Sequence, residues 1–202
     1  TPNATQGDKP FEPEWKNWSK EQRITEAKKL LAEAGYGDGK PLNFELLYNT
    51  NENHKKNAVA AAALWKEALG FVNITLTNQE WKTYLDSRRT QKFQMARGGW
   101  CADYNESFSF INNIKSGNSN NHAKYTSAQF DSLMDKTLHP DTTPQQRADL
   151  YQQAEAVLDA DQPQANVYHY VSARLVKPYV AGYSVKDPMD NWQIKNLSVL
   201  KH

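Results

Sequence analysis

A strand pattern, a helix pattern and a second strand pattern follow one another in the first half of the chain, and this alternation constrains the fold more than any other feature. Residues 42–48 alternate and then become apolar, as a half-buried strand does. Residues 52–69 favour a helix that stops at Gly70, and residues 71–77 place apolar side chains on one face of a second strand. Two strands joined by a crossover helix form a βαβ unit, so we expect a mixed α/β fold with parallel strands.

A capped helix is predicted before this unit. Ser19 and Gln22 have the spacing of a capping box, and Gly35 stands where a left-handed C-cap ends a helix. An apolar stripe at helical spacing runs between them, formed by Ile24, Ala27, Leu30, Leu31 and Ala34.

The remaining elements are predicted from the same kinds of signal. They are an extended lead-in over 1–18, a helix over 80–89, a strand over 92–96, a short apolar helix over 108–114, a mobile surface run over 115–125, helices capped by Thr126 and Thr143, a strand over 167–171, and short strands and turns over 174–202.

The composition excludes two classes of protein. Lys and Arg number 24 and Asp and Glu 23, a balance that lacks the basic excess of a nucleic-acid-binding protein. No apolar run approaches the roughly 18 residues that a membrane-spanning helix needs. The chain opens without an initiator methionine or an apolar leader, so we expect a processed or excised segment.

Metal, cofactor and catalytic chemistry have little support in the residues. Cys101 is the single cysteine, which excludes an internal disulfide and a zinc site built on several cysteines. None of the five histidines lies three or four residues from another, so no helix carries a metal-binding pair. Asp103 and Glu106 share an aromatic, glycine-containing loop, and a hydrolase could use them as an acid/base pair. We keep that hydrolase as an alternative.

The loop around Asp103 is better suited to binding. Gly98 and Gly99 lack side chains and so allow a ligand to approach the backbone closely. Trp100 offers a flat apolar wall, and Asp103 offers a negative charge beside it. This combination is typical of a site that captures an ammonium group.

Upstream residues supply the opposite charge. Trp81 adds a second aromatic wall, and Arg88 and Arg97 can hold carboxylates in bidentate geometry. The residues alone leave open whether Trp81 belongs to the core and whether Arg88 pairs with Asp86 or Glu80 instead. They also leave open whether residues 168 and 170, which share one face of the expected strand, face the core or a cleft.

Three stretches together resemble a known family: residues 78–86 (NQEWKTYLD), 96–105 (ARGGWCADYN) and 173–178 (ARLVKP). They are similar to the periplasmic oligopeptide-binding proteins of bacterial ABC peptide importers, the extracellular solute-binding protein family 5. The similarity covers essentially the whole chain, which resembles only the C-terminal part of these longer proteins. The resemblance implies the C-terminal lobe of a two-lobed, type II periplasmic-binding-protein fold, incomplete without the N-terminal lobe. Residues 1–171 are then most of that lobe, and residues 172–202 cross back to the missing one.

The resemblance also implies a set of ligand-binding residues. Asp103 corresponds to the carboxylate that takes the peptide α-ammonium, and the backbone of Gly99 and Cys101 lies beside the peptide as an added strand would. The residues at positions that line side-chain pockets or meet the peptide carboxylate are Trp81, Trp100, Arg88, Arg97, His54 and Tyr170. Cys101 corresponds to a cysteine that pairs with another one upstream of this chain. Glu106 and Ser107 depart from the family, in which a proline is common there.

The function implied by the resemblance is a non-catalytic receptor in the periplasm that captures oligopeptides between two lobes and delivers them to a membrane ABC importer. Its partners are the oligopeptide, the importer subunits and the N-terminal lobe, and we expect no cofactor, metal or nucleic acid. Family members that bind murein tripeptide, dipeptide or haem are alternatives within the fold, and the intact stretch 99–103 favours general oligopeptides. The hydrolase, and a lobe retained as a chaperone-like interaction surface, are alternatives outside that receptor class.

Overall fold

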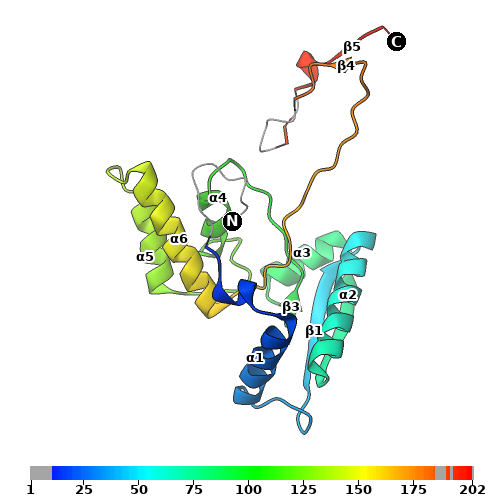
Figure 1. Cartoon of the computed structure of the whole chain (residues 1–202), viewed down its shortest axis with the longest axis vertical. Coiled ribbons are helices and arrows are strands. Elements are labelled where there is room, and N and C mark those ends of the chain that lie inside the picture. Colours follow the sequence, from blue (N-terminus) through cyan, green and yellow to red (C-terminus); the bar gives the residue numbers. More distant parts are fainter. Residues whose placement is uncertain (1–10, 185–189, 192, 202) are drawn as a thin grey trace. The chain divides into compact units, whose positions relative to one another are not determined.

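The computed structural model describes residues 11–184, 190–191 and 193–201. The chain divides into two compact units, and the boundary falls between Gly99 and Trp100. We call residues 12–99 the sheet unit, and Phe11 with the described residues from Trp100 onward the helical unit. Figure 1 labels most of the helices and strands of the two units, and these elements confirm the expected mixed α/β class.

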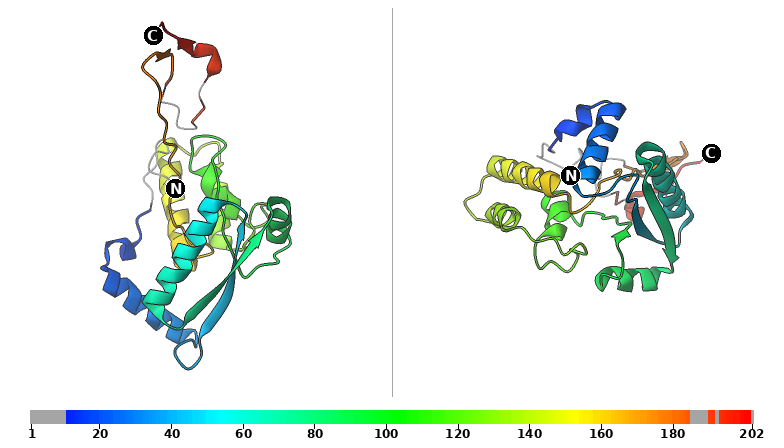
Figure 2. Two further views of the ribbon diagram at one scale, coloured as in Figure 1. Left: turned by 90° about the vertical axis from the view of Figure 1, so that its right-hand side faces the viewer. Right: turned by 90° about the horizontal axis from the view of Figure 1, so that it is seen from below.

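The βαβ unit predicted from the sequence is present in the sheet unit. Strands β1 (Leu42–Asn49) and β2 (Val72–Gln79) run parallel along their whole length. Helix α2 (Glu52–Leu69) connects them and packs along them (Figures 1 and 2). The side chain of Asn51 caps the start of α2. Gly70 ends it at a φ of 78°, a left-handed conformation that favours glycine.

The third strand is shorter than predicted. β3 (Met95–Ala96) pairs in parallel with β1, which gives the sheet order β2-β1-β3. Pairing begins late because the side chain of Gln94, rather than its backbone, accepts a hydrogen bond from the N–H of Glu45 (2.7 Å). Helix α3 (Trp81–Arg89) confirms its prediction, begins after the N-cap Glu80 and packs against β1.

The N-terminal helix has the predicted capping but not a fully covered stripe. A 3-10 turn, η1 (Glu14–Asn17), precedes α1 (Lys20–Glu33), whose capping box at Ser19 is present. Gly35, at a φ of 84°, takes the chain away from the helix as expected. No residue of α1 is fully buried, and Leu30 is 55% exposed. The apolar stripe is therefore covered only in part, where α1 contacts α2.

The core of the sheet unit lies between the sheet and α2. Its members are Leu46, Tyr48 and Ala58, with Ile74, Leu76 and Met95 packed against them. Because side chains alternate along a strand, Leu47 points to the opposite face of the sheet, where it is fully buried. Both faces of β1 are therefore covered.

The helical unit is built on two long helices. A short helix, α4 (Phe108–Ile111), continues into the 3-10 turn η2 (Asn112–Ile114), as the apolar run predicted. Helices α5 (Ala128–Thr137) and α6 (Pro144–Asp161) follow and lie side by side (Figures 1 and 2).

The caps of these helices test two predictions. Thr143 forms the predicted capping box with Gln146, and Pro144 occupies the first helical position of α6. The prediction that Thr126 caps α5 is wrong by one residue. Ser127 is the N-cap, and its hydroxyl accepts a hydrogen bond from the N–H of Phe130 (3.3 Å).

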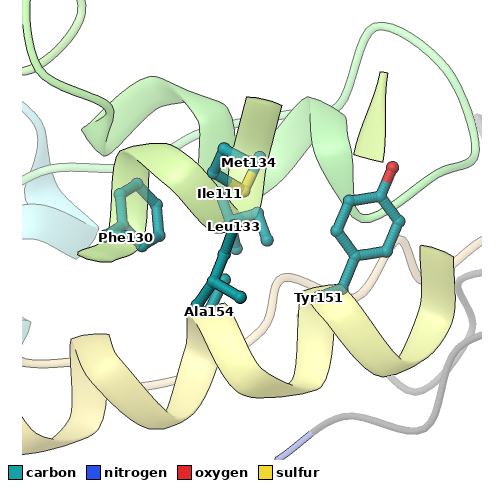
Figure 3. Close-up of a cluster of buried hydrophobic side chains, with 6 residues drawn as sticks. All are labelled: Ile111, Phe130, Leu133, Met134, Tyr151 and Ala154. Atoms are coloured by element: carbon teal, nitrogen blue, oxygen red, sulfur yellow. The ribbon is translucent and has the colours of Figure 1, made fainter. Parts of the chain in front are cut away.

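The core of the helical unit joins α4, α5 and α6 (Figure 3). Its buried side chains are Ile111, Phe130, Leu133, Met134, Tyr151 and Ala154. The phenol of Tyr151 is the one polar group of this cluster, and its partner belongs to the candidate site described below.

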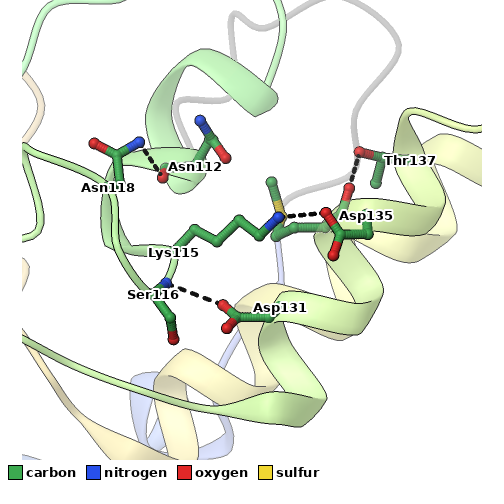
Figure 4. A network of polar contacts seen from close by, with 8 residues as sticks. Asn112, Lys115, Ser116, Asn118, Asp131, Asp135 and Thr137 are labelled. Carbon is green, nitrogen blue, oxygen red and sulfur yellow. Dashed lines mark hydrogen bonds and ion pairs between the residues drawn. The ribbon is translucent and has the colours of Figure 1, made fainter.

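The Asn- and Ser-rich run over 115–125 is more ordered in its contacts than the prediction of a mobile surface loop suggests. The backbone N–H of Ser116 donates to Asp131 Oδ1 on α5 (3.0 Å; Figure 4). Asn121 is buried, and its side chain donates to the carbonyl of Tyr125 (2.7 Å) while accepting from the N–H of the same residue (3.1 Å). Side-chain hydrogen bonds thus add to the backbone turns of this run and hold it in place.

The segment after α6 departs most from prediction. Residues 167–171 form no strand and are exposed, so the strand predicted there is wrong for this chain. A strand needs a neighbour to pair with its backbone groups, and none of the described strands lies beside this segment. Further on, β4 (Val180–Ala181) and β5 (Ser198–Val199) form a small antiparallel pair, and η3 (Ile194–Asn196) precedes β5.

Candidate functional site

The loop that carries Asp103 is anchored through its backbone and leaves the carboxylate open. The N–H of Asp103 donates to the buried hydroxyl of Ser109 on α4 (2.8 Å), which fixes the position of the residue. The Asp103 side chain is exposed, and among the described residues no ion pair to it is formed. A fixed, unneutralised carboxylate of this kind can receive a cationic group from a ligand.

Glu106, three residues further on, is engaged within the protein. Its Oε1 accepts hydrogen bonds from Tyr151 Oη (2.6 Å) and Arg147 Nη1 (3.3 Å), both on α6. Burial raises the pKa of Tyr151 well above its ordinary value, and the Glu106 carboxylate raises it further. The phenol therefore stays protonated and acts as the hydrogen-bond donor to Glu106. Glu106 therefore ties the loop to α6.

The side chains around Asp103 form an exposed aromatic surface. Trp100 is 40% exposed, and Tyr104 and Cys101 are exposed as well. Burial of part of its ring raises the pKa of Tyr104, and the charges of Glu106 and Asp103 add to this effect. Cys101 has a free thiol in this chain.

In the sheet unit, three of the predicted site residues surround one buried tyrosine. Tyr84 of α3 has no exposed surface, and its ring stacks against Trp81 with the centroids 5.7 Å apart. The guanidinium of Arg88 lies over the same ring, 5.6 Å from its centroid. The hydroxyl of Tyr84 donates to the carbonyl of Arg97. Tyr84 thus links both arginines and the tryptophan.

These contacts decide the alternatives left open by the sequence. Trp81 is 50% exposed and is not a core residue. Asp86 pairs with Arg89 (2.7 Å), so Arg88 has its place on Tyr84 rather than in that ion pair. A Cβ placed on Gly98 would lie 3.5 Å from Arg88 Nη2, which means that this guanidinium runs beside the glycine.

Arg97 and His54 both lie at the carboxyl ends of the parallel strands, where ligands commonly bind in α/β sheets. The N–H of Arg97 donates to the carbonyl of Leu47 (2.8 Å), so Arg97 directly follows the last pairing of β3. Burial lowers the pKa of His54, the charge of Arg97 lowers it further, and the carbonyl of Asn49 acts in the opposite direction. Burial and the charge of Arg97 thus both favour the neutral imidazole of His54.

At the same end of the sheet lie buried polar atoms that have no hydrogen-bond partner among the residues of known placement (11–184, 190–191 and 193–201). They are Asn49 Oδ1, Gln79 Oε1 and His54 Nδ1, and Asn49 and Gln79 are opposite each other in the strand register. Buried polar groups are nearly always paired with protein or water, so this end of the sheet is suited to hold water or a polar ligand.

The other predicted residues are exposed. Gly99 is the last residue of the sheet unit and lies outside every helix and strand. Tyr170 is 58% exposed, and its ring contacts that of Tyr168 edge to face, with 5.1 Å between the centroids. Neither tyrosine belongs to a core.

Sequence reasoning missed Tyr84, Ser109 and the partners of Glu106. Tyr84 stands three residues after Trp81 and four before Arg88, and this spacing places all three on one helix face. From this spacing, a contact of Tyr84 with Trp81 and Arg88 could have been predicted. The bond from Tyr151 to Glu106 joins residues 45 apart in the sequence and has no local pattern.

No metal centre or membrane span is evident in the residues that the structure describes. Within residues 11–184, 190–191 and 193–201, no three His, Cys, Asp or Glu side chains come together as metal ligands do. The helices in the same part of the chain are all too short or too polar to cross a membrane.

Comparison with known proteins places these features in context. The family model for bacterial extracellular solute-binding proteins, family 5 middle, matches residues 1–122. The periplasmic oligopeptide-binding protein OppA of Salmonella typhimurium is 56% identical over 203 residues, which cover all of this chain and 37% of that protein. The periplasmic murein peptide-binding protein MppA of Escherichia coli is 40% identical over 202 residues, with the same coverage. The chain thus spans about 37% of the length of these relatives.

Solved structures agree with the sequence matches. Escherichia coli murein tripeptide binding protein MppA superposes with a TM-score of 0.90 at 39% identity, over 100% of this chain and 39% of that one. Haemophilus influenzae OppA in complex with RPPGFSPFR superposes with a TM-score of 0.84 at 47% identity, over 95% of this chain and 37% of that one. The fold expected from the sequence, a partial lobe of a periplasmic binding protein, is confirmed.

Proposed function

The chain belongs to the bacterial extracellular solute-binding proteins of family 5, and from this membership we propose that it supplies most of the C-terminal lobe of an oligopeptide receptor. The receptor works in the periplasm, closes two lobes on a peptide and delivers it to a membrane ABC importer. It has no catalytic function and no cofactor. Ligand binding shifts the equilibrium from the open to the closed form, because the peptide contacts both lobes only when they are closed.

The state of Asp103 carries this proposal. An exposed carboxylate, held by its backbone and lacking an ion-pair partner among the described residues, is the group that a peptide α-ammonium requires. The backbone of Gly99 and Cys101, outside regular structure, is available to run beside the peptide main chain. The side chain of Trp100, which lies between these two residues in the sequence, forms an apolar wall beside the peptide. Backbone pairing of this kind gives affinity without selecting a sequence.

The side chains of the sheet unit meet the remainder of the peptide. Arg97 and His54 receive a peptide carboxylate, and Trp81 and Arg88 line a pocket for a side chain. The unpartnered polar atoms at the strand ends favour a wet pocket, in which water replaces contacts to particular side chains. Tyr170, exposed in this chain, completes a pocket wall.

We assign two further features to the missing N-terminal part. Residues 172–202 cross back to the N-terminal lobe, and residues 1–171 form the bulk of the C-terminal lobe. Cys101 pairs with a cysteine upstream of this chain, which accounts for its exposed thiol here.

The proposal is tested in a hybrid receptor, in which this chain replaces the matching segment of the Salmonella typhimurium relative. The substitution Asp103→Asn removes the charge and keeps the shape. We expect a loss of affinity of about 10- to 100-fold for the peptide Ala-Phe-Ala, because a hydrogen bond to a charged group contributes about 1.5–3 kcal/mol. The N-acetylated peptide, which has no ammonium group, should bind both proteins equally in calorimetry.

The same experiment separates the alternatives. Equal affinity of the two proteins for the free peptide would remove Asp103 from the site. Turnover of the peptide, lost in the Asp103→Asn variant, would instead establish the hydrolase. Murein tripeptide, dipeptide and haem, tried as ligands of the unmodified hybrid receptor, test the other members of the family. Binding of no free peptide would favour an interaction surface.

A further inference from the structure

Tyr84, a buried residue of the sheet unit, contacts three residues that the proposed function places against the peptide. Tyr84 has no surface of its own, yet Trp81, Arg88 and the carbonyl of Arg97 all lie against it. The position of Tyr84 therefore affects three ligand-facing groups at once.

Each contact constrains a different part of the pocket. The stack with Trp81, at an interplanar angle of 25°, orients the exposed indole. The face of the ring attracts the guanidinium of Arg88 and holds it beside Gly98. The hydroxyl fixes the backbone at Arg97, where the chain leaves the last pairing of β3.

We propose that Tyr84 is a positioning residue that sets the relative places of the two guanidinium groups and the indole. It touches no ligand and acts through Trp81, Arg88 and Arg97. The hydroxyl determines how well Arg97 meets a carboxylate, and the ring determines the wall for an apolar side chain. This role rests on the proposed function, since the placement of these groups matters to a peptide only if they meet it.

Two substitutions separate the hydroxyl from the ring. Tyr84→Phe removes the hydrogen bond to Arg97 and keeps the stack and the cation contact. Tyr84→Leu removes the ring as well. Tyr48→Phe is the matched control, because Tyr48 is a buried tyrosine of the same unit that packs in the core between the sheet and α2.

The first readout is the ratio of affinities of the hybrid receptor for Ala-Phe-Ala and for its C-terminal amide. Loss of one hydrogen bond is worth about 1 kcal/mol, so Tyr84→Phe should lower this ratio about fivefold. Tyr48→Phe should leave the ratio unchanged even if it lowers the melting temperature. Tyr84→Leu should in addition lower the affinity for the amide, because the amide carries the same phenylalanine side chain and the wall for that side chain depends on the Tyr84 ring. An unchanged ratio in Tyr84→Phe would overturn the proposal.

The second readout needs no peptide. The charge of Arg97 depresses the proton affinity of His54, so freeing the Arg97 backbone should move the NMR titration midpoint of His54 upward in Tyr84→Phe and not in Tyr48→Phe. If the unmodified hybrid receptor binds no peptide but the midpoint moves, the proposed function fails and the positioning by Tyr84 stands. If neither readout responds, Tyr84 is a core residue only.

Discussion

At the scale of single residues, two buried serines of α4 and its N-cap differ in one respect. Ser109 Oγ accepts a hydrogen bond from the N–H of Asp103 (2.8 Å), whereas Ser107 Oγ is buried and has no partner within the part of the chain that the structure describes. A buried hydroxyl without a partner loses its hydration and gains nothing in return. The two residues therefore contribute to stability with opposite signs, although they are two positions apart.

This difference gives a paired prediction. Ser107→Ala should raise the free energy of unfolding by about 1 kcal/mol, because it removes an unsatisfied buried polar atom. Ser109→Ala should lower it by about 1 kcal/mol, because it leaves the N–H of Asp103 without its acceptor. Urea unfolding of the two variants beside the unmodified chain measures both values. Destabilisation by Ser107→Ala as large as that by Ser109→Ala would show that the Ser107 hydroxyl has a partner in solution.

His54 gives a prediction for the pH dependence of binding. Its pKa lies below the ordinary 6.5 in the free protein, through burial and the charge of Arg97. A ligand carboxylate beside Arg97 offsets that charge and favours the imidazolium, so its arrival raises the pKa of His54. Binding therefore takes up a proton. The affinity for the peptide rises as the pH falls towards the pKa of His54 in the complex, and this gain in affinity is lost as the pH rises above that pKa.

Calorimetry of the hybrid receptor in two buffers of different ionisation enthalpy detects this proton. Ala-Phe-Ala should show uptake below pH 7, whereas its C-terminal amide should show none. The variant His54→Gln should abolish the difference between the buffers. Equal uptake for the acid and the amide would mean that the carboxylate does not reach His54.

At the scale of elements, local signals predicted what local contacts stabilise. The βαβ unit and the capping boxes at Ser19 and Thr143 follow from patterns within one or two helical turns, and they are present. The N-cap of α5 is displaced by one position because neighbouring hydroxyl residues, at 126 and 127, can both cap. Short-range signals of this kind therefore predict the presence of a helix or strand more accurately than they predict its first and last residues.

Elements and site residues that depend on distant partners were predicted less well. The strand expected at residues 167–171 has the right composition but no neighbour, so its backbone forms no ladder. The candidate site shows the same rule. Asp103 was identified from its loop, whereas the clamp of Tyr151 and Arg147 on Glu106 arises only when α6 packs beside the loop. A sequence pattern contains no record of such a pairing.

At the scale of the whole molecule, the residues to which the proposed function assigns a peptide contact come from both compact units. His54, Trp81, Arg88, Arg97 and Gly99 belong to the sheet unit, and Trp100, Cys101, Asp103 and Tyr170 belong to the helical unit. Consecutive residues 99 and 100 thus belong to different compact bodies.

The segment after α6 gives the last prediction, at the same scale. Val167, Val171 and Leu175 are almost wholly exposed, although apolar, β-branched and aromatic residues such as those of this segment favour a covered strand. If residues 172–202 cross to an N-terminal lobe, that lobe can pair with the backbone of this segment as a strand and cover its exposed apolar side chains. Its amide hydrogens should then exchange at least about tenfold more slowly in the hybrid receptor than in the isolated 202-residue chain.

Hydrogen–deuterium exchange with mass spectrometry measures this difference peptide by peptide. Residues 150–158 of α6 are the internal control, because their helix packs against α5 within this chain and needs no other lobe. Their exchange should be the same in both proteins. Slow exchange of residues 167–176 in the isolated chain would mean that the segment finds its partners within these 202 residues. Fast exchange in both proteins would mean that it does not reach the other lobe.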